Sequence, residues 1–324
     1  MNHPAIARLR AQFEAGLAAF LTEYPENSAA GIYDPIHYLL RLGGKRLRPV
    51  LAMAAAEAEG GEAADALPVA LAVETFHNFT LMHDDIMDAA PLRRGQPTVH
   101  LKWGDNAAIL SGDTMYTLAS LALAQTQPAH LPAITRTFYK TALEVCVGQQ
   151  LDMSFERRAD VTIPEYVEMI RLKTSVLLAG SLAMGAASAG ASAERQAAWY
   201  RFGERIGLAF QIQDDLLDTF GDEAVGKQIG GDILADKKTY LWIHTAASAK
   251  ADELSAWSGV ANRPAEKIEA IRSAMVAAGA DEAAREAMHT FVDEAMAELG
   301  NMGLHEDHHV LFAGLARMVT DRVS

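Results

Sequence analysis

The sequence predicts an all-α protein in which long helices surround a central cavity. Alanine is used heavily, aromatic residues make up only 7% of the chain, and β-branched runs are scarce, which favours helices over strands. Apolar residues recur at helical spacing along nearly the whole chain, whereas the alternating pattern of strands is almost absent. The 324 residues are 50% hydrophobic, enough for a sizeable core, and no low-complexity linker divides them. We therefore expect one domain over residues 1–324.

Several of the expected helices begin at recognisable signals. Asp34 followed by Pro35 is typical of an N-cap with proline at the first helical position. Thr162 and Glu165 have the spacing of a capping box. Paired glycines mark several breaks. In chain order, helices are expected at residues 4–22, 35–42, 47–59, 63–88, 106–124, 130–156, 164–189, 194–219, 238–249, 264–278, 282–299 and 306–322.

Composition excludes several classes of protein. The net charge of −14 and the pI of about 5.2 argue against nucleic-acid binding. A single cysteine, Cys146, excludes an intrachain disulfide framework, fits a reducing cytoplasm, and is expected in the core. The N-terminal residues lack the apolar region of a signal peptide. The uncharged stretch 174–193 is mostly Ala, Gly and Ser, so we expect a buried helix there and no transmembrane segment.

Two aspartate triads with the pattern D-D-x-x-D are the main functional signal. They are Asp84, Asp85 and Asp88 in HDDIMD and, 130 residues later, Asp214, Asp215 and Asp218 in QDDLLD. On a helix, positions i and i+4 lie on one face with i+1 beside them. Three clustered carboxylates repel one another, and a hard cation such as Mg²⁺ relieves that repulsion. One such motif alone usually faces solvent, but two copies after apolar runs predict two metal-binding faces that hold a polyphosphate.

Three basic segments could supply direct contacts to such an anion. They contain Lys45, Arg46 and Arg48 after the glycine pair at 43–44; Arg93 and Arg94 before Gly95; and Lys227, Lys237 and Lys238 among glycines. Glycine lets the backbone approach an anion closely, and arginine binds phosphate through two parallel hydrogen bonds. Each segment taken alone is equally well explained as a solvated turn.

Single polar residues are open to structural readings. His77 lies about two helical turns before Asp84, where a core histidine is the commoner explanation. Lys173, beside Thr174, could extend to solvent, and Gln211 could be a structural hydrogen-bonding residue. The histidines at 305, 308 and 309 lack the further ligands that a zinc site needs.

Taken together, these motifs resemble those of the trans-isoprenyl diphosphate synthases, the polyprenyl synthetase family. The matches, in chain order, are GGKRLRP at 43–49, E-x-x-H-x-x-x-L-x-HDDIMD at 74–88, LRRGQPT at 92–98, GQ at 148–149, KT at 173–174, FQIQDDLLD at 210–218 and GKQIGGDILADKKT at 226–239. The resemblance spans nearly the whole chain. It implies an isoprenoid-synthase-type helical bundle around a deep apolar pocket, commonly a homodimer. The implied enzyme couples isopentenyl diphosphate (IPP) to an allylic diphosphate in the cytoplasm.

The resemblance also implies roles for individual residues. Mg²⁺, three ions per active site, would be bound by the aspartates of both triads, with Asp215 and Asp218 in support. The residues that would contact the allylic diphosphate are Arg93, Lys173 and Lys237, with Lys227 nearby. The residues that would bind the IPP diphosphate are Lys45, Arg48, His77 and Arg94. Thr174 and Gln211 would face the reacting carbons.

Product length is expected to depend on residues just before the first triad. Phe79 precedes Asp84 by five residues and Thr80 precedes it by four. Small Thr80 lets a growing chain pass, and Phe79, with Phe76, then forms the floor. We expect mainly C20 geranylgeranyl diphosphate, with C15 farnesyl diphosphate as the alternative. If the helix is regular, Phe79 lies roughly opposite the aspartates, and Phe76 or a residue of another helix is the better floor candidate.

Two rival functions share parts of this pattern. A class I terpene cyclase would use the same ionisation chemistry, but it is expected to have one D-D-x-x-D motif and a different second metal motif. A non-catalytic partner subunit would typically lack one triad or the key cations. Both triads and the GGKRLRP segment are present, so the sequence favours the synthase.

Overall fold

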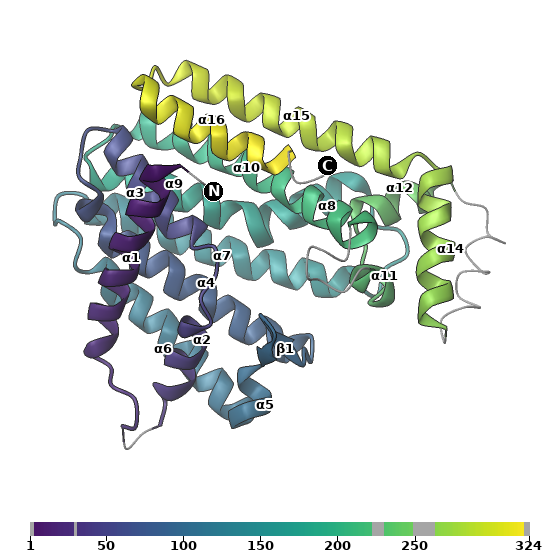
Figure 1. Ribbon diagram of the computed structural model, residues 1–324, viewed down its shortest axis with the longest axis horizontal. Helices are drawn as coiled ribbons and strands as arrows, with labels where there is room; N and C mark the ends of the chain where they lie inside the picture. The colour runs from purple at the N-terminus through teal and green to yellow at the C-terminus, as the bar shows by residue number, and fades with distance from the viewer. Residues whose placement is uncertain (1–2, 29–30, 222–229, 249–262, 321–324) are drawn as a thin grey trace. The chain divides into compact units, whose positions relative to one another are not determined.

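The computed structural model describes residues 3–28, 31–221, 230–248 and 263–320 (Figure 1). Within these residues every element longer than two residues is helical, which confirms the all-α prediction. Contacts divide the chain into two compact units. The first comprises Met1–Lys140 with Gly180–Trp199, and the second comprises Thr141–Ala179 with Tyr200–Ser324. A single domain over the whole chain stays a prediction, as does the central pocket.

The first unit holds the N-terminal helices and a short hairpin. Its elements are α1 (Pro4–Thr22), α2 (Asp34–Arg41), α3 (Leu47–Ala58), the 3₁₀ turn η1 (Ala63–Ala66), α4 (Leu67–Met87), β1 (Leu92–Arg93), β2 (Gln96–Pro97), α5 (Val99–Trp103) and α6 (Asp105–Leu123). Helices α4 and α6 run side by side (Figure 1) and share the most extensive interface in this unit. The first triad therefore lies on a helix that is braced along its length.

The second unit holds the C-terminal helices. Its elements are α8 (Ile163–Ile170), the π-helical turn η2 (Arg171–Ser175), α11 (Gly231–Leu234), α12 (Tyr240–Ser248), α14 (Pro264–Ala277), α15 (Ala280–Asn301) and α16 (Glu306–Thr320). Three helices pass from one unit to the other, namely α7 (Leu131–Phe155), α9 (Val176–Ser188) and α10 (Ala193–Phe220). Helices α15 and α16 lie side by side in Figure 1 and pack against each other.

The start signals gave one correct and one wrong prediction. The capping box is confirmed, because the Thr162 hydroxyl accepts from the Glu165 amide at 3.4 Å and the Glu165 carboxylate accepts from the Thr162 amide at 2.9 Å. Asp34 as an N-cap is wrong, because Tyr33 occupies that position and Asp34 lies inside the first turn. The Asp34 carboxylate instead accepts from the Asn27 amide at 2.7 Å and so fixes the preceding loop.

The helix expected at 164–189 is interrupted by the π-helical turn Arg171–Ser175. The stretch Ile163–Ser188 is long and apolar enough to cross a membrane, but 83% of its most apolar window is buried in protein. Burial of this kind is ordinary for a core helix, as the sequence predicts. The interruption contains Lys173 and Thr174, and π-helical turns are frequent at functional sites.

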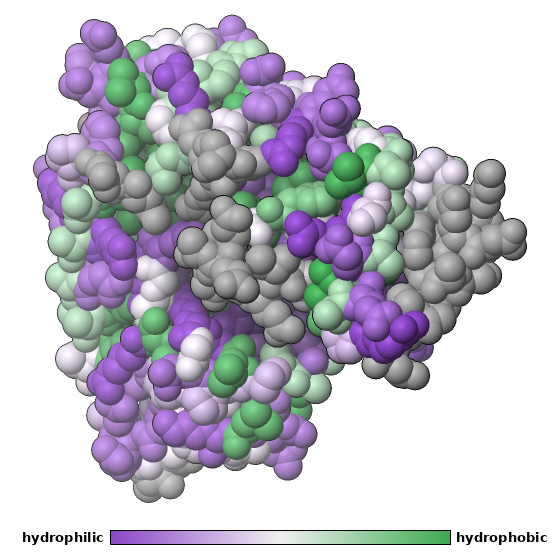
Figure 2. Space-filling view, turned by 45° about the vertical axis from the view of Figure 1, so that its right-hand side comes forward, coloured by the Kyte–Doolittle hydropathy of each residue, from purple (hydrophilic) through white to green (hydrophobic). Residues whose placement is uncertain are grey.

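Exposed apolar residues occur singly or in small groups and are most numerous on α6 and α7. On the face drawn in Figure 2, hydrophobic residues lie in small groups among hydrophilic ones. Large apolar side chains are exposed on α5, α6 and α7, among them Leu110 at 57% and Leu143 at 67%. Cys146, expected in the core, is also exposed, because it lies on the same open side of α7 between Leu143 and Val147.

Candidate functional site

The basic segment after the first triad is a β-hairpin with two-residue strands and a two-residue turn. Leu92 pairs with Pro97 and Arg93 with Gln96. The two turn residues, Arg94 and Gly95, have φ of 54° and 76°. Positive φ at both central positions is typical of the type I′ turn, whose twist matches that of a hairpin. The hairpin therefore holds Arg93 in a strand and Arg94 in the turn, so the two consecutive arginines have fixed positions that differ from each other.

Arg93 binds the middle aspartate of the first triad. Its guanidinium donates from Nε at 3.0 Å and from Nη2 at 2.5 Å to Asp85 Oδ1. Asp85 is only 1% exposed, and burial raises its pKa although Arg93 opposes the shift. Asp84 is half-buried and Asp88 is exposed at the end of α4. The three carboxylates therefore differ in burial, and Asp85, the buried one, is bound by Arg93.

Arg94 points to the glycine pair that precedes α3. Its Nη1 donates to the carbonyl oxygen of Gly43. Gly44 has a φ of 137°, a backbone conformation that favours glycine, and a Cβ there would lie 2.8 Å from Arg94 Nη2, so the guanidinium would have to shift. The hairpin thereby fixes the GGKRLR loop through the arginine that follows Arg93.

Arg48 and His77 contact each other and, together with Arg94, form a cationic site. Arg48 Nη1 lies 3.2 Å from His77 Nε2, and because arginine can only donate, that nitrogen is the acceptor of a neutral ring. Burial and then the charges of Arg48 and Arg94 hold the pKa of His77 well below its ordinary value. Arg48 Nε is buried without a hydrogen-bond partner among the described residues. Lys45 is exposed beside it. Such a site is suited to bind an anion.

In the second triad the middle aspartate is again buried and bonded to side chains of the protein. Asp215 is 3% exposed, and its carboxylate accepts from the Tyr166 hydroxyl and, at 3.3 Å, from the Gln211 amide. Burial and the nearby Asp232 raise the pKa of Asp215 to about 7, against these hydrogen bonds. The Thr174 hydroxyl donates to Gln211 Oε1 at 3.1 Å, so the structure brings together three residues that sequence analysis singled out.

The outer aspartate of this triad contacts the next helix. Asp218 Oδ2 accepts from the backbone amide of Asp232 at 2.9 Å, in the first turn of α11. Lys237 lies 3.9 Å from the Asp232 carboxylate. The segment expected to be a flexible basic loop is therefore partly ordered by Asp218. Lys227 lies outside the described residues.

Lys173 lies in the π-helical turn and is paired with Asp152 of α7 at 2.5 Å. A Cβ on Gly148 would lie 2.2 Å from the Lys173 amide nitrogen, and one on Gly207 would lie 2.6 Å from Ser175 Cα. Two glycines thus let α7 and α10 approach the turn from their own sides. This accounts for the Gly148 of the GQ motif, whose role the sequence alone does not reveal.

Aromatic rings gather on α4 ahead of the first triad. Phe76 is 1% exposed and has ring contacts with Phe79, Tyr116 and Phe138 at 5.4 to 5.5 Å. Phe79 stacks on Tyr116 at 5.5 Å with 15° between the planes. Thr80 is half-buried beside them. Helix α4 is regular here, so these rings form one cluster shared between helices, and the role of Phe79 and Phe76 in product length stays a prediction.

Several site residues escaped sequence analysis because their partners are distant in the chain. They are Asp152, Tyr166, Tyr116 and Glu74. Glu74 had a signal, since it begins the E-x-x-H pattern that contains His77. The others lie in segments whose composition is ordinary for a buried helix.

The aspartates fit Mg²⁺ as part of a shared ligand set. Among the described ranges no three His, Cys, Asp or Glu side chains come close enough to hold a metal ion by themselves. Mg²⁺ usually keeps waters and takes one or two carboxylates together with substrate phosphates. Within the first unit, Asp84 and Asp88, one helical turn apart, match that requirement, and within the second unit Asp214 and Asp218 on α10 do so separately.

Comparisons with known proteins point in one direction. A family model described as polyprenyl synthetase matches residues 29–294. The chain is 46% identical over 216 residues to the geranylgeranyl diphosphate synthase of Methanosarcina mazei, covering 66% of this chain and 67% of that protein. It is 39% identical over 276 residues to the geranylgeranyl pyrophosphate synthase of Geoglobus acetivorans, covering 85% and 86%. It is also 40% identical over 242 residues to the geranylfarnesyl diphosphate synthase of Natronomonas pharaonis, covering 68% and 71%.

Solved structures agree with the sequence relatives. A crystal structure of a geranylgeranyl pyrophosphate synthase matches with a TM-score of 0.93 and 41% identity over 100% of both chains. That of the geranylgeranyl pyrophosphate synthetase from Pyrococcus horikoshii matches with a TM-score of 0.92 and 30% identity over 98% of both.

The neutral state of His77 predicts a specific pH dependence of stability. As pH falls below about 6.5, the unfolded chain protonates His77 while the folded chain does not, so the free energy of unfolding falls by up to about 1.4 kcal/mol per pH unit. His77→Asn removes this contribution. The melting temperature of the wild type should therefore fall more steeply than that of the variant between pH 7.5 and 5.5. Exposed His305→Asn is the control, and parallel curves for wild type and His77→Asn would refute the assignment.

Proposed function

The chain belongs to the polyprenyl synthetase family, and we propose that it is a short-chain prenyltransferase that condenses IPP with allylic diphosphates. The relatives named geranylgeranyl diphosphate synthase support a C20 main product. A geranylfarnesyl product, as named for another relative, would be one isoprene unit longer than C20. C15 farnesyl diphosphate is the shorter alternative. A soluble, cytoplasmic enzyme fits the burial of its most apolar helix.

One observation carries the proposal: a single hairpin contacts both the first triad and the GGKRLR loop. We interpret these as two different anion sites. Arg93 contacts the carboxylate triad, and the next residue, Arg94, contacts the GGKRLR loop. The first site offers carboxylates for a metal–diphosphate complex. The second offers arginines and a neutral histidine, which suit a diphosphate without a metal. Two diphosphates bound next to each other are what a two-substrate condensation needs, whereas a cyclase has one substrate.

Each group then has a defined task. We assign Mg²⁺ binding to Asp84, Asp88, Asp214 and Asp218, with Asp85 and Asp215 positioning them. When bound, Mg²⁺ neutralises the diphosphate that leaves the allylic substrate. Three ions per site is the number that the family resemblance implies.

The remaining residues bind and orient the substrates. Lys45, Arg48, His77 and Arg94 bind the IPP diphosphate, while Arg93, Lys173 and Lys237, with Lys227 nearby, bind that of the allylic substrate. Thr174 and Gln211, joined by a hydrogen bond, face the carbons that react. The allylic carbon–oxygen bond breaks, the IPP double bond supplies the new carbon–carbon bond, and a proton leaves to the released diphosphate.

The proposal is tested with purified protein, Mg²⁺, IPP and allylic diphosphates of one, two or three isoprene units, with products sized by mass spectrometry. We expect elongation to a C20 product, abolished by EDTA and restored by Mg²⁺. A C15 product would support the prenyltransferase assignment and correct the predicted product length. No elongation by folded, metal-supplied protein would refute the synthase assignment and favour a partner subunit. Cyclic hydrocarbon from a C20 substrate alone would favour a cyclase.

Product length should respond to the aromatic floor. Phe79→Ala removes the ring stacked on Tyr116 and should lengthen the main product by at least one isoprene unit, since one helical turn of 5.4 Å is close to the length of one unit. Phe76→Ala, measured alongside, tests the buried member of the cluster. Phe202→Leu, in a buried aromatic pair outside this cluster, controls for general loss of packing. Unchanged length in Phe79→Ala would reject Phe79 as the stop.

We further propose that the protein is a homodimer through α6 and α7. Leu110 and Leu121 are exposed on one face of α6, and between them the hydroxyls of Thr114 and Thr117 bond to the helix's own carbonyls, so their methyl groups face outward. An apolar face of this kind on a soluble protein is typical of an interface. A second copy, presenting the same face, is the partner that matches it.

Sedimentation velocity tests the dimer. The sedimenting wild-type species should have twice the 34.9 kDa mass of one chain. The Leu110→Glu variant should sediment as a monomer, because the substitution would bury a charge at the interface. Val310→Glu, at an apolar residue 53% exposed on α16, is the matched control and should stay dimeric. A monomeric wild type, or a Leu110→Glu dimer, would contradict this interface.

A further inference from the structure

Arg46 is the one basic residue of the GGKRLR loop that sequence analysis left without a role. Its side chain is buried, at 4% exposure, between the exposed Lys45 and the site residue Arg48. Its φ is 50°, in the left-handed region that non-glycine residues rarely adopt. Such a conformation persists only where the surroundings hold it. The loop is therefore held by contacts of the Arg46 side chain.

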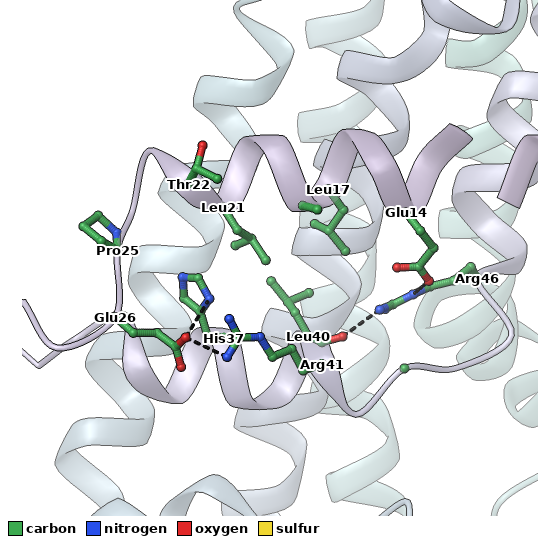
Figure 3. Close-up of a pocket in the computed structure, with 12 residues that line it drawn as sticks. Glu14, Leu17, Leu21, Thr22, Pro25, Glu26, His37, Leu40, Arg41 and Arg46 are labelled. Atoms are coloured by element: carbon green, nitrogen blue, oxygen red, sulfur yellow. Dashed lines mark hydrogen bonds and ion pairs between the residues drawn. The ribbon is translucent and has the colours of Figure 1, made fainter. Parts of the chain in front are cut away.

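All three nitrogens of the Arg46 guanidinium donate to different helices. Nε donates to Glu14 of α1 at 2.9 Å, Nη1 to Glu74 of α4 at 2.7 Å, and Nη2 to the Leu40 carbonyl near the end of α2 at 2.6 Å. Figure 3 draws the contacts with Glu14 and Leu40. A planar guanidinium serves three acceptors at once, which a lysine ammonium on a flexible stem does not reproduce.

Helix α1 grips the same loop at a second point. Arg10 Nη2 donates to the Gly44 carbonyl at 3.0 Å. Glu14, one turn further along α1, also borders a cavity of about 500 Å³ between α1 and α2, with Arg46 at the same end (Figure 3). Because the cavity leaves the Glu14 side chain 41% exposed, this contact can be removed without opening the core.

We propose that Arg46 is a positioning residue for the IPP subsite and that α1, through Glu14 and Arg10, sets the affinity of that subsite. The inference rests on the proposed function. The left-handed turn at Arg46 fixes the backbone that carries Lys45 and Arg48, while Glu74 connects the same guanidinium to α4, which carries His77. If α1 no longer holds the GGKRLR loop, the side chains that bind IPP are displaced, while the two aspartate triads are unchanged.

Steady-state kinetics of Glu14→Ala tests this inference. The KM for IPP should rise about tenfold, equivalent to roughly 1.4 kcal/mol of lost binding, while kcat and the KM for the allylic substrate stay within about twofold. Glu14→Gln keeps an oxygen that accepts from Arg46 Nε and should recover most of the affinity. Arg10→Ala should raise the same KM through the Gly44 contact.

The matched control is Glu57→Ala, which removes an ion pair of 2.7 Å between α1 and α3 that does not touch the loop. Its KM for IPP should equal that of the wild type. Wild-type KM for IPP in both Glu14→Ala and Arg10→Ala, or an equal rise for both substrates, would overturn the inference and leave Arg46 a structural residue. A wild-type enzyme that does not use IPP would overturn the proposed function itself.

Discussion

The bidentate contact between Arg93 and Asp85 determines the geometry of the first unit's site. The contact anchors one strand of a hairpin whose turn is only two residues long, so the neighbouring Arg94 has almost no freedom of its own. Consecutive Cα atoms are 3.8 Å apart. The carboxylate triad and the loop that holds Gly43 are therefore contacted by two side chains whose Cα atoms are one peptide unit apart. A longer or glycine-rich connection would let the two anion sites drift apart.

The two triads solve one electrostatic problem with different partners. In each, the middle aspartate is buried and bonded to the protein, Asp85 to Arg93 and Asp215 to Tyr166 with Gln211. Three ionised carboxylates within one turn repel one another, and engaging the middle one lowers that repulsion. The outer aspartates, one turn apart, then remain at the more accessible positions of the motif. The two motifs thus share a buried, bonded middle position, and under the proposed function the outer positions would bind the metal.

Sequence reasoning predicted the helices well because periodicity and capping are local. It expected residues 4–22 to be helical, and α1 spans the same residues. It missed the interruption at Arg171–Ser175, because a π-helical turn depends on neighbours such as Gly148 that approach from another helix. It likewise assigned Lys173 to the site but could not find Asp152, 21 residues earlier, as its partner. Pairings of this kind are set by packing, which no single local pattern contains.

The cations assigned to the two proposed anion sites have different partners, and this difference bears on the proposed need for metal at only one of them. Lys173 and Arg93, assigned to the allylic diphosphate, are each held by a carboxylate. Their charge is already compensated, so a diphosphate arriving alone would meet net negative potential, and added divalent cations reverse that balance. Arg48 and Arg94 contact a neutral imidazole and a backbone carbonyl, which leave their charge available. If the proposed function holds, the allylic substrate would depend on Mg²⁺ for binding as well as for ionisation, whereas IPP would bind to the protein's own cations.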